Sequence, residues 1–551
     1  SRGIKIPTLC HHPDLKPHGA CRMCLVEDED TGRLMASCVT PAAANMKIRT
    51  DSDRVVRHRR NIVRLMIAEH PESCIVCSKG NRCRLRQNAA ELGVGETHLY
   101  PMPNYKNFEQ ANPFIVRDLS KCILCGKCIR ADHELVVVGA IDYNLRGFRS
   151  RPATVHDQAL EKSNCTFCGT CVAMCPTGAL SVYDRNYVGT PEKTAASICG
   201  FCAVGCALEL GIYGDRVVEI NPANHTDSVN RSTLCVRGHF ANDYLNSNKR
   251  LISPMRREND ESTGTRQVPV DWELAIDTVA RRLNEIAKTN GPQSIGFIGS
   301  AKGSIEENYL LQKIARAAIG TNNLDHGNYV SGRSLQPLLD QRIGGRCRTT
   351  ALSGIEKAEV IFLIGADPGQ TLPVVGYHIK RAVKKGVPLV VIDPRSTDLA
   401  RMATYWLQAS PGGDLALINA LAAMLISEGS YDAAFIERQT EGFSVYRMGL
   451  SGLEPATVAE SAGIDPEALQ KVAALLDGKK IAWIAGSGIT RQRNRSHTFD
   501  ALINLALMTG NWGESGNSFY LLTKESNAIG AADMGVHPDF LPGRSSLRRP
   551  E

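Results

Sequence analysis

The chain has 551 residues, 43% hydrophobic and 22% charged, which is ordinary for a globular protein and long enough for several domains. No apolar run approaches eighteen residues and no secretory signal is present, so the sequence predicts neither a transmembrane helix nor a secreted protein. The formal charge of +7 counts cysteine as neutral, and thiolate ligands would offset much of it, so we expect no nucleic-acid partner. The nearest basic block, residues 57–60, is interpreted as a solvated helix face.

Cysteine is the most informative residue type in this chain. Of its nineteen cysteines, all but Cys347 fall into spaced groups before residue 236. Groups of this kind in a large chain without a secretory signal indicate metal sites and a reducing compartment rather than disulfides. Their spacings are typical of iron–sulfur ligands, so we predict a protein that transfers single electrons. We interpret Cys347 as a buried structural thiol.

The first cysteine group has the pattern C-x10-C-x2-C-x13-C and consists of Cys10, Cys21, Cys24 and Cys38. This pattern favours a [2Fe–2S] cluster. Structural zinc is the alternative, although the long first spacer is poor for a zinc ribbon. Because the chain reaches Cys10 almost at once, we expect the natural N-terminus to lie further upstream.

The second group, H-x3-C-x2-C-x5-C, follows an apolar and helical stretch at residues 62–68. Its members, which we call the His70 set, are His70, Cys74, Cys77 and Cys83. A lone histidine beside a proline would be interpreted as a surface residue. Three cysteines directly downstream need a fourth ligand, however, and imidazole is a suitable one. We therefore predict a [4Fe–4S] cluster with one histidine ligand.

The third and fourth groups resemble the paired motifs of two-cluster ferredoxins. The motifs are Cys122, Cys125 and Cys128, then Cys165, Cys168, Cys171 and Cys175 followed by Pro176. In such ferredoxins the fourth ligand of each motif binds the other cluster. Cys175 should therefore complete the first ferredoxin set (Cys122, Cys125, Cys128, Cys175), and Asp132 the second ferredoxin set (Cys165, Cys168, Cys171, Asp132). The alternative is that Asp132 is solvated and the second cluster is absent, which leaves three rather than four [4Fe–4S] clusters in the chain.

The fifth group, C-x2-C-x3-C-x28-C, consists of Cys199, Cys202, Cys206 and Cys235. Residues 208–220 between its ligands alternate in hydrophobicity, as strands do. We predict a small β-rich cap domain over a further [4Fe–4S] cluster.

From about residue 250, helical patterns alternate with short apolar strands, which predicts a parallel α/β sheet. Asp271 should cap one helix, and Ser304 with Glu307 forms a capping box for another, which Gly320 ends. The expected strands are residues 294–298, 360–364, 387–392 and 481–485. A ligand would bind at loops 365–368, 393–395 and 486–488, although these could be ordinary turns. None is a G-x-G-x-x-G loop, so we expect no NAD or flavin on this chain.

The order of these groups resembles the large iron–sulfur subunit of NADH:quinone oxidoreductase, the respiratory complex I. It resembles equally the catalytic subunit of NAD-linked, molybdenum- or tungsten-dependent formate dehydrogenases. Residues 392–395 and 504–516 look like motifs of the molybdopterin oxidoreductase superfamily, to which both belong. The resemblance implies an α/β multidomain chain, with ferredoxin-like iron–sulfur domains followed by a molybdopterin-oxidoreductase-type α/β region. The expected domain bounds are 1–50, 51–110, 111–190, 191–250 and 251–551.

The two families differ at the metal. Formate dehydrogenases carry cysteine or selenocysteine followed by histidine where this chain has Ser331 and Gly332. The resemblance therefore implies no catalytic residue and no bound molybdopterin guanine dinucleotide, although serine ligates molybdenum in related oxotransferases. If the pterin were bound, Arg237 would lie between cluster and pterin, and Asp393 and Arg395 would lie in the pterin region.

The resemblance also implies partners. Electrons would come from a flavoprotein subunit that holds FMN and oxidises NADH, together with a thioredoxin-like [2Fe–2S] subunit. They would leave toward a quinone-reducing or other acceptor module, so that the chain meets the inner face of the cytoplasmic membrane only through partners. The alternatives are an active molybdenum or tungsten bis-pterin formate dehydrogenase, a hydrogenase-linked diaphorase subunit and a non-catalytic zinc scaffold.

Overall fold

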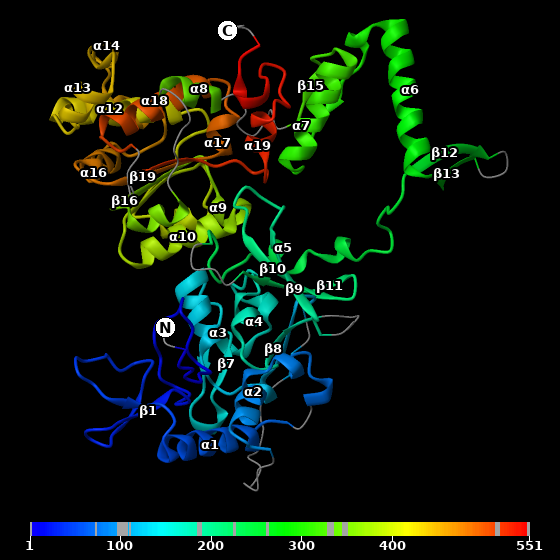
Figure 1. Ribbon diagram of the computed structural model, residues 1–551. Helices are drawn as coiled ribbons and strands as arrows, with labels where there is room; N and C mark the ends of the chain where they lie inside the picture. The colour runs from blue at the N-terminus through cyan, green and yellow to red at the C-terminus, as the bar shows by residue number, and fades with distance from the viewer. Residues whose placement is uncertain are drawn as a thin grey trace. The chain divides into compact units, whose positions relative to one another are not determined.

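The computed structural model describes residues 3–71, 74–95, 108–109, 112–183, 190–223, 228–260, 264–327, 336–343, 351–512 and 518–547. The chain forms two compact units, which can be followed in the ribbon of Figure 1. Unit 1 consists of Ser1–Ile198 and Cys206–Leu245, and unit 2 of Cys199–Gly205 and Asn246–Glu551. In the described part of the chain, no helix has the length and apolar character needed to cross a membrane.

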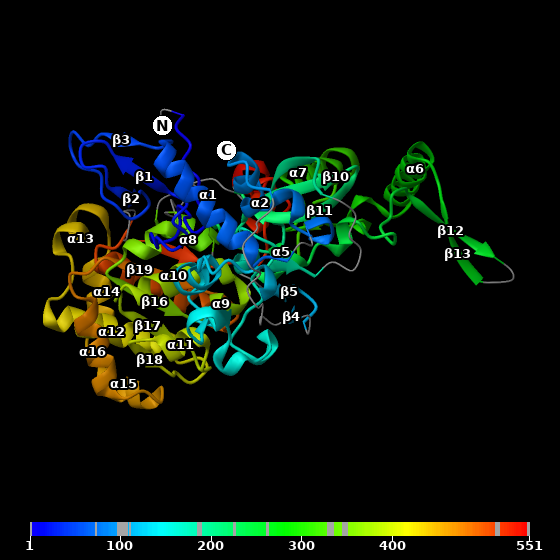
Figure 2. The ribbon, with the colours of Figure 1, turned by 90° about the horizontal axis from the view of Figure 1, so that it is seen from below.

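Unit 1 begins with a small antiparallel sheet in the order β2-β1-β3. Its strands are β1 (Leu25–Asp28), β2 (Leu34–Ala36) and β3 (Ile48–Arg49). Helix α1 (Asp53–Ala68) follows and packs against β1, as Figure 2 shows. The Ser52 hydroxyl caps α1 by accepting the Val55 N–H.

The predicted solvated face at residues 57–60 is wrong for one residue. Arg59 is only 5% exposed and donates from Nη2 to the Leu25 carbonyl. It lies four residues from both Val55 and Val63, which are fully buried, so it belongs to the stripe that α1 packs inward. One residue of the basic segment 57–60, Arg59, therefore stabilises the packing of α1 instead of facing solvent.

The remaining elements of unit 1 are short and alternate with long connecting loops. They are α2 (Arg84–Glu91), β4 (Phe108–Glu109), β5 (Ile115–Asp118), α3 (Lys127–Arg130), a π-helical turn η4 (Ala131–Val136), β6 (Asp142–Asn144), β7 (Arg151–Ala153), α4 (Thr170–Met174), β8 (Leu180–Val182), β9 (Lys193–Ile198), β10 (Ala207–Tyr213), β11 (Arg216–Pro222) and α5 (Val236–Phe240). The predicted strand run 208–220 is confirmed as β10 and β11, which are antiparallel and turn at Gly214 with a φ of 58°.

Unit 2 is built on a five-stranded parallel sheet in the order β18-β17-β16-β19-β20. The strands are β16 (Val360–Ile364), β17 (Leu389–Ile392), β18 (Tyr405–Leu407), β19 (Ile481–Ala485) and β20 (Ser518–Leu521). The predictions for 360–364 and 481–485 are confirmed. Strand β17 begins later than predicted, because Pro388 has no N–H to donate to a sheet.

Successive residues of the central strands point to opposite faces of this sheet, and helices cover both. Val360, Phe362 and Ile364 pack with α12, α16 and α18, whereas Ile361 and Leu363 pack with α10. Figure 1 shows these two helical layers on either side of β16 and β19. The covering elements are η12 (Leu352–Lys357), α10 (Pro373–Lys384), α11 (Asp398–Met402), α12 (Asp414–Glu428), α16 (Pro466–Leu476) and α18 (Arg495–Met508).

The outer elements of unit 2 complete the chain. They are β12 (Met255–Asp260), β13 (Gly264–Pro269), α6 (Trp272–Asn290), β14 (Phe297–Ile298), α7 (Ile305–Lys313), a π-helical turn η10 (Ile314–Ile319), β15 (Leu324–Asp325), α8 (Gln336–Arg342), α9 (Pro368–Thr371), α13 (Ala433–Gln439), α14 (Phe443–Gly449), α15 (Pro455–Ser461), α17 (Ser487–Thr490) and α19 (Ala528–Asp533). The Asp271 cap, the Ser304–Glu307 capping box and the end at Gly320 are confirmed. The strand expected at 294–298 is only β14, because a 3-10 turn with Pro292 at its start takes the preceding residues.

Replacing Phe362 with alanine should destabilise unit 2 by about 3–5 kcal/mol, because the side chain is fully buried and a cavity would remain. Its ring packs on Trp483 with centroids 4.7 Å apart. All four tryptophans of the chain lie in unit 2, so tryptophan fluorescence during urea unfolding reports on this unit. Val445→Ala, at an exposed position, is the matched control and should change stability by no more than about 0.5 kcal/mol.

Candidate iron–sulfur sites and nucleotide pocket

The first cysteine group lies together in the β1–β3 part of unit 1. Cys10, Cys21 and Cys24 are buried, and the backbone N–H groups of Cys10 and Cys21 each point at the other's sulfur at 3.4–3.5 Å. A hydrogen bond from Cys21 lowers the pKa of the Cys10 thiol to about 5. Cys38 lies within electrostatic range of Cys24 and Cys10. The structure thus brings all four predicted ligands together, and amides directed at sulfur suit an iron–sulfur cluster, whose potential such hydrogen bonds help to set.

The His70 set lies where α1 ends. The three cysteines interact electrostatically, and Cys83 is buried while Cys74 is exposed. His70 follows the helix cap Glu69, and its Nδ1 lies 3.2 Å from the Pro71 carbonyl. A carbonyl can only accept, so Nδ1 carries the proton in this contact and Nε2 carries the lone pair that could bind a metal.

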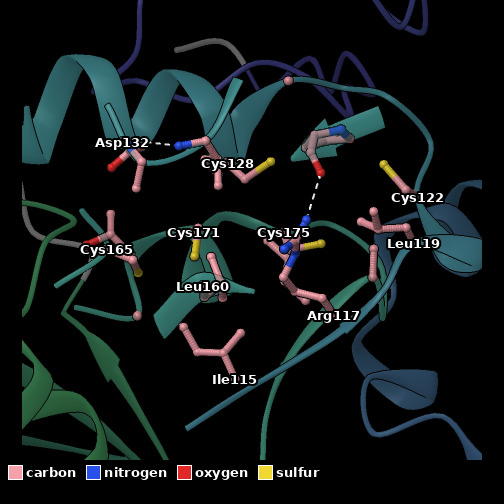
Figure 3. Close-up of a pocket in the computed structure, with 18 of the residues that line it drawn as sticks. Ile115, Arg117, Leu119, Cys122, Cys128, Asp132, Leu160, Cys165, Cys171 and Cys175 are labelled. Carbon is pink, nitrogen blue, oxygen red and sulfur yellow. Dashed lines mark hydrogen bonds between the residues drawn. The ribbon is translucent and has the colours of Figure 1, made fainter. Parts of the chain in front are cut away.

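The two ferredoxin motifs surround one cavity of unit 1, shown in Figure 3. Strand β5, helices α3 and α4 and the loops before them supply its walls. The lining includes all seven motif cysteines, Cys122, Cys125, Cys128, Cys165, Cys168, Cys171 and Cys175, together with Asp132. The seven thiols and one carboxylate are the donor set that two [4Fe–4S] clusters need, so the residues fit these groups.

The structure groups these ligands as the exchanged pairing predicts. Cys175 is the strongest charged neighbour of Cys125 and also interacts with Cys128. Asp132 instead interacts with Cys165, Cys168 and Cys171. Figure 3 shows the same division, with Asp132 and Cys165 on one side and Cys122 on the other. Ligation by these sets remains a prediction.

Asp132 lies in the π-helical turn η4, at a fixed position. Its Oδ2 accepts the N–H groups of Ala140 and Ile141 at 2.6 and 3.2 Å. Burial raises the pKa of Asp132 despite these hydrogen bonds. The structure thus holds Asp132 at the cavity rather than free in solvent, with one oxygen bound to backbone. The presence of the second cluster stays a prediction.

The environment of the cavity favours the protonated form of its cysteine thiols when no metal is bound. Burial raises the pKa of Cys125 to about 12 and that of Cys165 to about 11. Burial and then neighbouring thiols raise the pKa values of Cys128 and Cys171 well above the ordinary value. Because the ligand form is the thiolate, iron binding must release these protons and should therefore depend on pH.

The fifth group is divided between the units. Cys199 and Cys202 lie in the short segment of unit 2, whereas Cys206 directly precedes β10 and Cys235 caps α5, both in unit 1. All four are buried. Within unit 1, Cys235 interacts electrostatically with Cys168 of the second ferredoxin set.

A second cavity, of about 520 Å³, lies in unit 2 at the carboxyl ends of the parallel strands. The segments after β16, β17, β18, β19 and β20 all line it, at residues 365–367, 370–372, 393–395, 410–412, 486–488 and 522–524. The three loops predicted from the sequence are therefore brought together where ligands bind in open α/β sheets. The volume lies within the range of small-molecule and cofactor sites.

Charged side chains of both signs line this cavity, namely Asp367, Asp393, Asp414, Arg395, Arg491 and Lys524. Asp367 is buried, burial raises its pKa, and its Oδ1 has no hydrogen-bond partner among the described residues. Asp414 accepts a hydrogen bond from Gln492 Nε2 at 2.5 Å. Asp393 accepts hydrogen bonds from the backbone N–H and the Nε–H of Arg395. A buried carboxylate with one oxygen that lacks a donor fits the adjacent N–H groups of a guanine or pterin edge. These residues could thus hold a pterin dinucleotide, and its expected absence remains a prediction.

Some expected residues are not placed at either cavity, and others were missed. Ser331 and Gly332, Cys347 and residues 513–516 lie outside the described residues. Arg237 lies in α5 of unit 1. Asp367 lies in the predicted ligand-binding loop 365–368, whereas Asp414 was not predicted. Nor, in unit 1, was Lys79, a lysine with a buried ammonium group that lies between two predicted ligand cysteines. Its position inside the His70 set was the only available signal.

Known protein families match five consecutive segments of the chain. They are a 2Fe–2S iron–sulfur cluster binding domain at residues 1–53, the NADH-ubiquinone oxidoreductase-G iron–sulfur binding region at 59–98, a 4Fe–4S dicluster domain at 121–179, the molybdopterin oxidoreductase Fe4S4 domain at 192–247, and molybdopterin oxidoreductase at 250–541. The predicted fold class, iron–sulfur domains followed by a molybdopterin-oxidoreductase-type α/β region, is confirmed.

Similar proteins extend over nearly the whole chain. The NADPH-Fe(3+) oxidoreductase subunit alpha of Geobacter sulfurreducens is 34% identical over 99% of this chain and 63% of its own length. A Staphylococcus aureus protein named as a formate dehydrogenase is 28% identical over 99% of this chain and 59% of its own. The chain thus spans about three fifths of these curated relatives. With these matches, and with more than half of its residues in the molybdopterin oxidoreductase model, the chain belongs to the molybdopterin oxidoreductase family.

Proposed function

We propose that this chain is an iron–sulfur electron-transfer subunit of an oxidoreductase complex supplied by a reduced nicotinamide. The observation that carries the proposal is the cavity of unit 1, where two cysteine runs and Asp132 converge. Iron–sulfur clusters supply one-electron transfer when bound. The chain's own part is to hold the ligand sets close together. Arg84, which follows Cys83, donates its N–H to the carbonyl of Pro176, which follows Cys175, at 2.9 Å.

The electron source in this proposal is a flavoprotein partner that oxidises NADH or NADPH. The NADH-ubiquinone oxidoreductase-G region at 59–98 and the name of the Geobacter relative support a nicotinamide-linked complex. We further propose a thioredoxin-like [2Fe–2S] partner between the flavoprotein and this chain. The acceptor is a quinone-reducing module at the inner face of the cytoplasmic membrane, or another electron acceptor.

The unit 2 cavity favours a second candidate function, catalysis by a molybdenum or tungsten pterin. Its volume, its position at the strand ends and the unpartnered Asp367 oxygen suit a pterin dinucleotide. The relatives named as formate dehydrogenases support the same candidate. In that case Asp367, Asp414 and Arg395 would hold the nucleotide, and substrate oxidation would occur on this chain rather than elsewhere.

Metal analysis and reduction assays separate the two candidates. Purified protein should contain about eighteen iron atoms per chain, from one [2Fe–2S] and four [4Fe–4S] clusters, and no zinc. NADH or NADPH with the flavoprotein partner should bleach the visible absorbance, whereas formate should not. Molybdenum or tungsten with formate-dependent dye reduction would instead establish the second candidate. A colourless zinc protein would contradict both.

A variant of one predicted ligand tests the first ferredoxin set. Cys122→Ser should lower the iron content by about four atoms, since it removes one thiolate of the first ferredoxin set. Thr194→Ala, at an exposed position of β9 in the same unit, is the control and should retain all the iron. Unchanged iron in Cys122→Ser would contradict the assignment.

A further inference from the structure

We propose that the ammonium group of Lys79 is a tuning charge, which raises the reduction potentials of the clusters held by the three ligand sets around it. This proposal rests on the proposed function, because it concerns clusters that the cysteines hold. Lys79 would be a positioning residue rather than a ligand. Its role would be to supply one fixed positive charge at the junction of the His70 set and both ferredoxin sets.

The backbone places Lys79 inside one ligand set, and its side chain reaches the other two. Lys79 lies between Cys77 and Cys83 in the chain. Its Nζ donates to the carbonyl of Val172 at 2.7 Å and to that of Cys175 at 3.1 Å. Val172 belongs to α4 and Cys175 is the residue that ends this helix. The ammonium is thus fixed at the carboxyl end of α4, where a cation is favoured.

The surrounding backbone holds the two segments in contact independently of Lys79. Arg84 N, next to Cys83, donates to Pro176 O, next to Cys175. Gly178 lies so close to the Cys77 sulfur that a Cβ atom there would collide with it. The His70 set and the Cys175 loop are therefore neighbours through two further contacts, and removing the Lys79 side chain should leave them packed.

The thiols around the ammonium come from three different ligand sets. Cys175 is its strongest charged neighbour of opposite sign, and Cys171 and Cys83 also lie within electrostatic range. By the exchanged pairing, these belong to the first ferredoxin set, the second ferredoxin set and the His70 set. Lys127, a buried lysine of the same region, interacts with Cys125 and Cys175, both of the first ferredoxin set. Lys79 is thus positioned to act on three clusters.

The direction of the effect follows from electrostatics. A cluster gains one negative charge when it is reduced, and a nearby cation stabilises the more negative state. The ammonium is buried, so solvent screens this attraction weakly. Burying an unpaired ammonium is costly, whereas anionic clusters with their thiolates would compensate for it. Removing the charge should therefore lower the reduction potentials.

The test is an EPR-monitored redox titration of the iron-loaded protein, in which signals are separated by their relaxation temperatures. In Lys79→Met, at least one [4Fe–4S] signal should shift to lower potential by about 59 mV, a tenfold change in the one-electron equilibrium. Lys79→Arg keeps the charge and should restore the wild-type value. Lys162→Met removes an exposed lysine of the same unit and should shift nothing.

Two outcomes would overturn the proposal. The first is Lys79→Met that keeps its iron and titrates as wild type, which would show that the ammonium only caps α4. The second is loss of iron in both Lys79→Met and Lys79→Gln. Glutamine keeps a hydrogen-bond donor, so loss of iron in this variant as well would show that Lys79 is needed for the structure rather than for the potential. Failure of the proposed function is distinct, because wild-type protein would then contain no iron to titrate.

Discussion

Air-oxidised wild-type protein should show the EPR signal of a [3Fe–4S] cluster, and the Asp132→Cys variant should lack it. Asp132 is the predicted fourth ligand of the second ferredoxin set, whose other three ligands would be thiolates, and all four residues line one cavity. A carboxylate is a harder ligand than thiolate and binds iron–sulfur clusters less tightly. The iron at this corner should therefore be the first to leave on oxidation, and cysteine should retain it.

The geometry around Asp132 makes this expectation specific. Two backbone N–H groups hold Oδ2, so the carboxylate cannot rotate freely and the other oxygen has a defined position. Asp132→Asn preserves the size of the side chain and removes its negative charge. It should lose up to about four iron atoms from the second ferredoxin set, while the first set, completed by Cys175, keeps its own.

Iron content distinguishes an Asp132 that binds a cluster from an Asp132 that only accepts backbone hydrogen bonds. If wild-type protein and Asp132→Asn contain equal iron and neither gives a [3Fe–4S] signal, Asp132 is only a backbone cap for residues 140–141. Asp142→Asn is the control at an exposed position of the same region and should behave as wild type.

Glu356→Gln should destabilise unit 2 by about 3–5 kcal/mol, the usual effect of breaking a buried ion pair. Glu356 is a buried carboxylate that joins η12 to α10. It accepts from His378 Nδ1 and Arg381 Nε, both at 2.9 Å, and pairs with Lys385 at 2.9 Å. His378 and Arg381 are themselves buried, so glutamine would remove the negative charge that faces a buried guanidinium.

The contribution of Glu356 should depend on pH in a defined direction. Burial alone would raise its pKa, but the hydrogen bond from His378 and the charge of Arg381 outweigh burial and hold the pKa far below the ordinary value of 4.5. A depressed pKa in the folded state means that the stabilisation is complete above the unfolded value. It is lost as the pH falls below about 4.5, toward the folded pKa.

Urea unfolding followed by tryptophan fluorescence measures this effect in unit 2 alone. The difference in unfolding free energy between wild type and Glu356→Gln should be largest at about pH 7 and should shrink below pH 4.5. Glu441→Gln removes an exposed glutamate of the same unit and should have little effect. A difference that is constant with pH would show that glutamine acts through packing rather than through lost charge.

The sequence predicted those features of the molecule that depend on residues close together in the chain. Cysteine spacing identified the ferredoxin motifs, because a cluster fixes the separation of its ligands along the chain. Strands 360–364 and 481–485 were predicted because they are short, wholly apolar and bounded by glycine or polar residues. The ligand-binding edge of the sheet followed from the parallel topology.

Other features depend on contacts between distant segments, which a single sequence does not display. Arg59 is buried because β1 offers it a carbonyl 34 residues away. Lys79 reaches α4 across 93 residues. Asp367 and Asp414 meet in one cavity only after the sheet has formed.

The hydrophobic clusters of unit 1 contain the ligand cysteines themselves. Cys10, Cys21, Cys83 and Cys125 belong to one cluster, and Cys128 belongs to the other with Cys165, Cys171 and Cys175 packed against it. The same side chains therefore belong to the core and are the predicted ligands, whereas the core of unit 2 is mainly aliphatic and aromatic. A cell short of iron would thus produce chains whose first unit is poorly consolidated and open to proteases. Supply of the metal would then set how much of the protein accumulates.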